Sequence, residues 1–71
     1  MEKIRIFYDH KGNTLNVWFD DPEKEMFSEE TEAEVILVKD KNGRVIGFEI
    51  LNFISDPTRE DIRIPVEVLM G

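Results

Sequence analysis

Two stretches of this chain share one pattern, and that repeat restricts the fold more than any other feature. Residues 8–19 align without gaps on residues 39–50. The alignment superposes an Asp and a Gly in each copy: Asp9 on Asp40, and Gly12 on Gly43. Asp can accept hydrogen bonds from backbone two residues further on, and Gly adopts positive φ without steric cost, so both favour a turn. The pattern predicts two antiparallel β-hairpins, over residues 3–20 and 35–52.

The remaining segments connect or extend these hairpins. Residues 20–34 read as an acidic connection, with one helical turn as an alternative within 28–34 because Thr31 to Glu34 has a capping-box pattern. Residues 53–61 form a second connection, in which Ser55 or Asp56 before Pro57 favours a short helical turn. Apolar residues then alternate over residues 62–69, which predicts a C-terminal strand. Pro65 lacks an N–H group and places that strand at a sheet edge.

The fold class that follows is mostly β (or small α+β), in one domain over residues 1–71. It has two hairpins, a C-terminal edge strand and at most one short helical turn. No apolar run approaches the length of a membrane span, and the first residues lack the pattern of a signal peptide. We therefore expect a cytoplasmic protein.

The hairpins carry apolar residues on both faces. One face takes alternate residues of the second strand in each hairpin: Leu15, Val17, Phe19, Ile46, Phe48 and Ile50. The other face takes Trp18, Val45 and Leu51, and no long amphipathic helix exists to cover it. At 71 residues and without cysteine, the chain also lacks disulfides to compensate for a small core. These features predict a homodimer; the alternative is a monomer in which residues 20–34 and 52–61 cover the second face.

Negative charge is concentrated in one segment. Residues 20–34 hold eight acidic residues and one lysine, a net charge of −7 that equals the net charge of the whole chain. Such a segment repels phosphate backbones, which argues against direct DNA or RNA binding. It suits a basic protein partner, because complementary potentials accelerate association. The simpler interpretation is a solvated connection that keeps the protein soluble.

Candidate partner contacts follow from charge and from exposed aromatic character. They comprise one aromatic residue and five glutamates: Trp18, Glu29, Glu30, Glu32, Glu34 and Glu49. Trp is enriched at binding hot spots, although a second-face Trp also fits a dimer core. Glu49 lies between apolar neighbours in a strand, where it is either solvent-facing or paired with a cation such as Arg5 or Arg44. A small-ligand groove around Tyr8, Trp18 and Phe48 is a further possibility.

The sequence offers little catalytic chemistry. Asp9 and His10 could form a general-base pair, but no nucleophile is placed for them to activate. The paired carboxylates at residues 20–21 and 29–30 could bind a hard cation, yet no apolar residues surround them to shift a pKa. Residues 40–43 resemble the start of a calcium loop, but position 12 of that loop is Leu51 rather than an acid. We expect no enzyme activity, no cofactor and no metal.

Several motifs resemble one family of small bacterial and archaeal proteins, the domain of unknown function 2283 family. The motifs are Phe7-Tyr8-Asp9, Leu15-Asn16-Val17-Trp18-Phe19, the acidic stretch, and residues 40–51. The resemblance covers residues 4–52 and is most specific in the second hairpin. The chain departs from the pattern at Asn13, where an acidic residue is common, and in residues 62–69. The resemblance implies a β-rich domain of no established activity, whose members are suspected of being antitoxins in toxin–antitoxin pairs.

Overall fold

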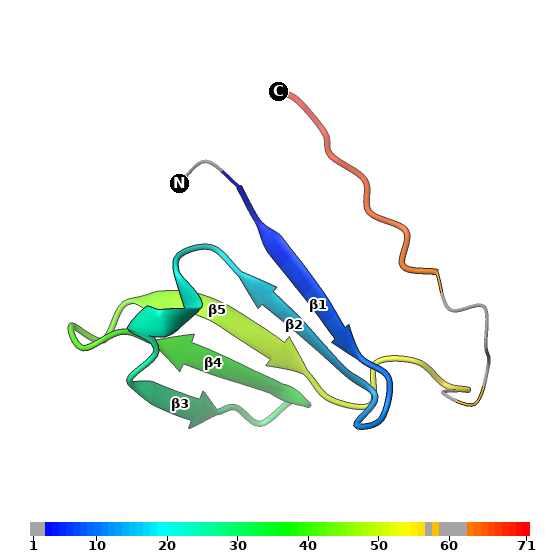
Figure 1. Ribbon diagram of the computed structural model, residues 1–71, viewed down its shortest axis with the longest axis horizontal. Coiled ribbons are helices and arrows are strands. Elements are labelled where there is room, and N and C mark those ends of the chain that lie inside the picture. Colours follow the sequence, from blue (N-terminus) through cyan, green and yellow to red (C-terminus); the bar gives the residue numbers. More distant parts are fainter. Residues whose placement is uncertain (1–2, 57, 59–62) are drawn as a thin grey trace.

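The computed structural model describes residues 3–56, 58 and 63–71, and their core is one antiparallel sheet (Figure 1). Its five strands are β1 (Arg5–Asp9), β2 (Thr14–Trp18), β3 (Phe27–Glu30), β4 (Val35–Lys39) and β5 (Val45–Ile50). Their order across the sheet is β1-β2-β5-β4-β3. The helical structure of the described residues is limited to one 3-10 turn, η1 (Pro22–Lys24). The expected mostly β class is confirmed.

Both predicted hairpins form, and an aspartate closes each turn, although the positive φ lies at Asn13 (+53°) rather than at Gly12 in the first turn. In the β1–β2 turn, Asp9 Oδ1 accepts hydrogen bonds from the backbone N–H groups of Lys11 (3.1 Å) and Gly12 (3.3 Å). In the β4–β5 turn, the Asp40 carboxylate plays the equivalent role, and Gly43 has a φ of +79°. The hairpins join through β2 and β5, which pair antiparallel.

One of the five strands, β3, lies in the acidic segment, for which the sequence predicted a connection or one helical turn. β3 pairs with β4, Glu29 lying opposite Leu37, and no described residue of 28–34 is helical. The Thr31 hydroxyl, predicted to cap a helix, instead donates to the carbonyl of Val35 at 2.7 Å and closes the turn into β4. β3 forms because, without it, β4 would leave a row of unpaired backbone N–H and C=O groups at its edge. A solvent-facing edge strand also tolerates charged side chains.

The predicted C-terminal strand over residues 62–69 does not form. Residue 62 lies outside the described residues, and residues 63–71 carry no strand. They run as an open segment on the outer side of β1 (Figure 1). Apolar residues do alternate here, but a strand also needs a partner edge, and residues 63–71 pair with none in the single chain. The helical turn expected at residues 55–57 falls partly on Pro57, which is also outside the described residues.

The hydrophobic core is small for a sheet with so many apolar residues. The register aligns two rows of four residues on one face: Ile6, Val17, Phe48 and Leu37, and beside them Tyr8, Leu15, Ile50 and Val35. We call these eight residues the apolar face. The buried apolar residues are Leu15, Val17, Val38 and Ile46. Most of the apolar face is therefore only half-buried.

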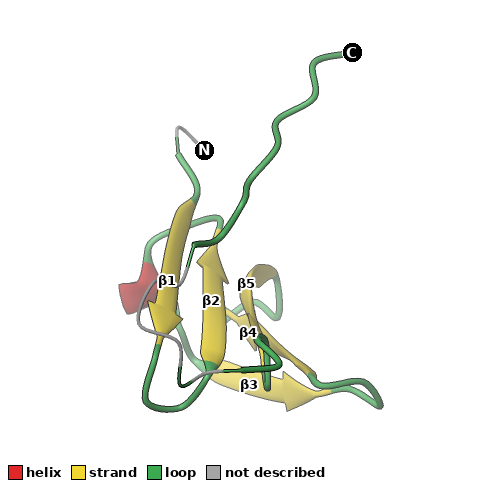
Figure 2. Ribbon diagram, turned by 90° about the vertical axis from the view of Figure 1, so that its right-hand side faces the viewer, coloured by secondary structure: helices red, strands yellow, loops and turns green. Residues whose placement is uncertain are grey.

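Gly47, in the centre of the sheet, allows β5 to approach β2 closely. A Cβ atom at Gly47 would lie 2.6 Å from the carbonyl oxygen of Val17 and 3.1 Å from the Trp18 ring. The register between β4 and β5 shifts beside Gly47, at Val38 and Lys39. The strands also rotate strongly across the sheet, since β1 and β2 stand upright in Figure 2 while β3 lies nearly across them. Among the described residues, no helix has the length and apolarity needed to cross a membrane.

Candidate functional site

The acidic segment consists of a capped turn followed by an edge strand. Asp21 lies at the N-cap of η1, and its carboxylate accepts a hydrogen bond from the backbone N–H of Glu23 at 2.9 Å. Asp20 accepts from the backbone N–H of Asp21 at 2.7 Å and forms an ion pair with Lys24 at 3.2 Å. The hydrogen bond from Asp21, and then Lys24, lower the pKa of Asp20. This carboxylate pair therefore has a structural task in the turn.

The edge strand β3 is exposed along its whole length. All four of its residues are solvent-exposed, and no described strand pairs with its outer side. Thr31 N–H donates to the Val35 carbonyl, in register with the β3–β4 pairs, so odd-numbered residues of β3 bond inward to β4. Just before the strand the pattern is irregular, since Met26 N–H donates to the Lys39 carbonyl at 2.9 Å. Because bonding directions alternate along a strand, Ser28 and Glu30 direct their backbone N–H and C=O groups outward. The outer side of β3 thus presents both hydrogen-bonding groups and negative charge.

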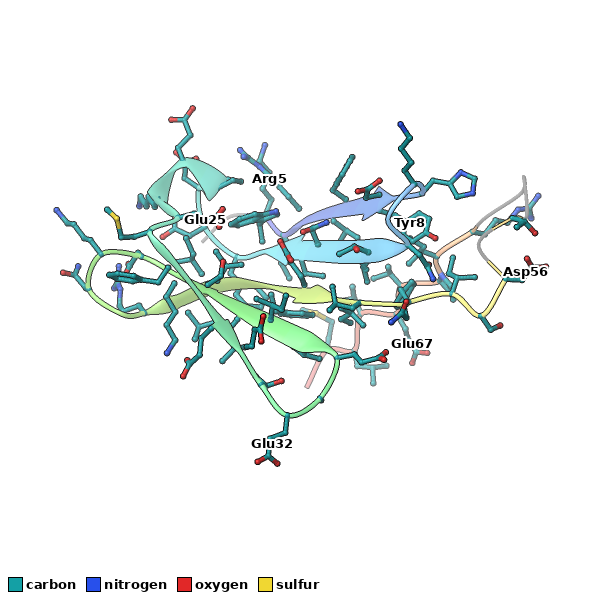
Figure 3. The ribbon with its side chains drawn as sticks, turned by 90° about the horizontal axis from the view of Figure 1, so that it is seen from below. Arg5, Tyr8, Glu25, Glu32, Asp56 and Glu67 are labelled. Carbon is teal, nitrogen blue, oxygen red and sulfur yellow. The ribbon has the colours of Figure 1, made fainter. Side chains whose placement is uncertain are left out.

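Four of the predicted contact residues gather at this side of the sheet: Glu29, Glu30, Glu32 and Glu34. We call these four residues the acidic edge. Figure 3 shows Glu32 at the tip of the β3–β4 turn, pointing away from the sheet. Glu29 forms an ion pair with Lys39 of β4, and Glu34 accepts a hydrogen bond from Asn52 at 3.3 Å. The acidic segment therefore has more carboxylates than it has lysines forming ion pairs with them.

The other two predicted contact residues lie elsewhere. Trp18 is on β2 opposite Gly47, and Glu49 is on β5 between Asn16 and Ile36. Both are half-buried on the face opposite the apolar face. The structure therefore separates Trp18 and Glu49, on the central strands, from the acidic edge.

The candidate catalytic pair lies in the β1–β2 turn. The Asp9 carboxylate holds that turn closed through the two backbone N–H groups described above, and the His10 ring lies 6.2 Å from the Tyr8 ring. Asp40, in the equivalent turn, is 4% exposed and accepts hydrogen bonds from the N–H groups of Asn42 (2.9 Å) and Arg44 (3.0 Å). The hydrogen bond from Arg44 lowers the pKa of Asp40 despite burial, which acts in the opposite direction. Both aspartates serve the turns.

Sequence reasoning missed a hydrogen-bonded clasp centred on Asn13. Its side-chain oxygen accepts from the Tyr8 hydroxyl (2.7 Å) and from the N–H of Ile54 (3.0 Å). Its side-chain nitrogen donates to the Ile54 carbonyl at 2.8 Å, and its own carbonyl accepts from Phe53 at 3.1 Å. Asn13 has a φ of +53°, which Asn tolerates better than most residues. Its place after Gly12, where the family pattern has an acid, is the signal that could have identified it.

The predicted ligand groove does not coincide with the hollow beside the acidic turn. That hollow, of about 410 Å³, lies between residues 23–26 and the β4–β5 turn. Its lining includes Lys24, Met26, Asp40 and Arg44, but none of Tyr8, Trp18 and Phe48. Within the described part of the chain, no three His, Asp or Glu residues are grouped so as to hold a metal ion.

Comparison with known proteins adds the family. No curated protein and no solved structure matches the chain. One family model matches residues 5–53, which contain all five strands and the Asn13–Phe53 contact. The chain therefore belongs to the DUF2283 family of proteins of unknown function.

Proposed function

We propose that this chain is a non-enzymatic protein-interaction module, a homodimer that binds a basic protein partner through its acidic edge. The observation that supports this most is the folding of the acidic segment into an exposed edge strand. A solvated connection would offer charge alone. An edge strand also offers the backbone groups of Ser28 and Glu30, to which an extended peptide can add as a further strand.

The partner that fits this edge is an extended segment rich in Lys or Arg. Main-chain hydrogen bonds to β3 would supply affinity, and basic side chains beside Glu30 and Glu32 would supply selectivity and fast association. A small basic toxin would satisfy this description, in which case the module acts as an antitoxin. Because the charges are exposed, binding should weaken as salt shortens the Debye length to about 8 Å at physiological ionic strength.

A defined peptide with alternating Lys and Val residues tests this proposal. We expect the peptide to shift the backbone NMR resonances of Ser28 and Glu30. Glu30→Lys/Glu32→Lys should abolish the shifts. The matched control is Glu23→Lys/Glu25→Lys, which changes the same charge in the same segment but off β3. Equal weakening by both double variants would indicate general charge attraction and contradict binding at the edge.

The homodimer part of the proposal is supported by the small core. Ile4, just before β1, is 56% exposed, Ile6 and Phe7 on β1 are 43% and 62% exposed, and the apolar face is mostly half-buried. A second copy would bury this surface at about 25 cal/mol per Å² of apolar area. Light scattering during size-exclusion chromatography should give the mass of two chains over a wide dilution range. The mass of one chain at every concentration would contradict it.

A further inference from the structure

We propose that residues 63–68 of one copy pair antiparallel with the outer edge of β1 in a second copy, and that the exchange is reciprocal. This inference rests on the proposed homodimer and names the contact that holds it. Residues 63–71 lie beyond the family match, which ends at residue 53. They belong to no strand of their own sheet. Four of them are among the most exposed large apolar residues of the chain: Val66, Val68, Leu69 and Met70.

The hydrogen-bond pattern determines which backbone groups the edge of β1 leaves open. Phe19 N–H donates to the Ile46 carbonyl at 2.8 Å, continuing the β2–β5 ladder. Because directions alternate, odd-numbered residues of β2 bond to β5 and even-numbered ones bond to β1. The β1 partners of those even-numbered residues are Arg5, Phe7 and Asp9. The even-numbered residues of β1 and just before it therefore direct their backbone N–H and C=O groups to the outer side of β1. These residues are Ile4, Ile6 and Tyr8.

The C-terminal segment matches this edge in one register. When Val66 lies opposite Ile6, Ile64 lies opposite Tyr8 and Val68 lies opposite Ile4. All three residues of the segment have an N–H group to donate. Their side chains fall on the same side as Ile6 and Tyr8, and so extend both rows of the apolar face by one strand.

The same register pairs opposite charges. Between the bonded pairs, Glu67 lies opposite Arg5 and Arg63 lies opposite Asp9. Opposite charges directly across two strands are favourable, and these non-bonded pairs have the closest side chains. Moving the segment by two residues in one direction places Arg63 opposite Phe7, and in the other direction opposite Lys11. The shift toward Lys11 loses both charge pairs, and the shift toward Phe7 loses the Arg63–Asp9 pair and places Glu67 opposite Lys3 instead of Arg5.

Pro65 fits this register as well. In this register Pro65 lies opposite Phe7. The backbone groups of both residues point away from the contact between the C-terminal segment and β1. Its missing N–H is therefore not needed, whereas a shift by one residue would place Pro65 at a bonded position. The proline thus excludes every odd shift, and the charges disfavour the nearest even ones.

The partner in this pairing is a second copy rather than the same chain. Ile54 is held to Asn13 beside the β1–β2 turn, so the segment starts near the correct end of its own β1. It nevertheless leaves the sheet and extends past its end (Figure 2), with Val66 63% and Val68 78% exposed. Closure on its own edge would extend the apolar face by one strand but would bring no second copy to it. Exchange brings a second sheet beside the first, and the connection after Ile54 is long enough to act as a hinge.

An engineered disulfide tests both the register and the exchange, because the chain has no cysteine. Non-bonded antiparallel pairs have Cα atoms about 4.5 Å apart, within the range that a disulfide spans. We expect Arg5→Cys/Glu67→Cys to form a covalent dimer on mild oxidation, seen by non-reducing electrophoresis and mass spectrometry. The matched control, Arg5→Cys/Leu69→Cys, moves one thiol about 7 Å along the strand and should cross-link far less.

Each other outcome overturns the exchange. A bridge within one chain would mean that the segment closes on its own β1. Free thiols, or equal cross-linking of the control, would mean that the proposed register is absent. A chain ending at residue 62 should be a monomer where the full chain is a dimer. If the shortened chain stays a dimer while the thiols of Arg5→Cys/Glu67→Cys stay free, the homodimer stands and only the exchange fails. A full chain that is a monomer would contradict both.

Discussion

The two outer strands of the sheet, β1 and β3, differ in what they offer to another chain. Every residue of β3 is exposed, and glutamates are half of the strand and half of the turn over residues 31–34 that follows it. β1 carries apolar residues between Arg5 and Asp9, and its own chain contains a segment of matching pattern. Two copies of β3 would repel each other, since like charges directly across strands are unfavourable. This difference is why we propose one edge for a foreign basic partner and the other edge for self-association.

Gly47→Ala should have the largest effect, because it removes the sheet that both edges share. The new Cβ would lie 2.6 Å from the Val17 carbonyl, a backbone atom that cannot move without disturbing β2. We expect a loss of about 3 kcal/mol in the free energy of unfolding, measured by urea denaturation. Gly12→Ala, whose nearest new contact is a side-chain oxygen at 3.1 Å, is the matched control and should cost much less. Equal losses would contradict the close packing assigned to Gly47.

Ile6→Pro should weaken self-association with little effect on the β1–β2 ladder. The N–H of Ile6 points outward, so its loss removes one hydrogen bond from each of two symmetric contacts. At about 1 kcal/mol for each bond, the dimer dissociation constant should rise about 30-fold. Sedimentation at several concentrations measures this.

Phe7→Pro is the control for Ile6→Pro, since the N–H of Phe7 points toward β2. It should lower the stability of the sheet more than Ile6→Pro does. The reverse order of stability would mean that the outward side of β1 has been assigned wrongly.

Asp40→Asn should selectively loosen the hairpin that supports β3. Asp40 is buried, whereas Asp9 plays the same role in an exposed turn, so we expect the larger fall in Tm from Asp40→Asn. Since folding lowers the pKa of Asp40, its ionised form stabilises the fold above the ordinary pKa range of aspartate. That contribution disappears as pH falls through the lowered pKa. The Tm difference between the native chain and Asp40→Asn should therefore shrink on acidification; a difference that grows would contradict the assignment.

Glu29→Gln should have the smallest effect. Glu29 is exposed in its ion pair with the half-buried Lys39, and pairs near the surface contribute about 1 kcal/mol or less. We expect a change below that value in the free energy of unfolding and no change in self-association. A large loss of dimer on this substitution would show that β3, rather than β1, joins the copies.

The hairpins were predictable because their information is local. Asp9, Gly12, Asp40 and Gly43 specify turns through bonds to residues close in sequence. β3 was missed because its glutamates have low strand propensity and the edge of β4 decides their conformation. The Asn13 clasp joins residues 41 positions apart, so the departure from the family pattern at Asn13 could mark this position but not its partner Ile54.

Where the candidate contact residues lie in the fold was predictable only in part, for the same reason. The four glutamates of the acidic edge were found from charge density, which is a property of one segment. Trp18 and Glu49 were grouped with them by residue type, but the strand order places them on the central strands. The alternation in residues 62–69 was visible, yet a strand also depends on the edge it meets.

Amide hydrogen exchange, read residue by residue in the full chain, tests the difference between the edges most directly. We predict slow exchange at Ile6 and Tyr8 that becomes faster on dilution or after removal of residues 63–71. Ser28 and Glu30, with outward N–H groups at the other edge, should exchange fast until a basic peptide is added. Fast exchange at Ile6 and Tyr8 at every concentration, or protection of Ser28 and Glu30 without a partner, would contradict the account.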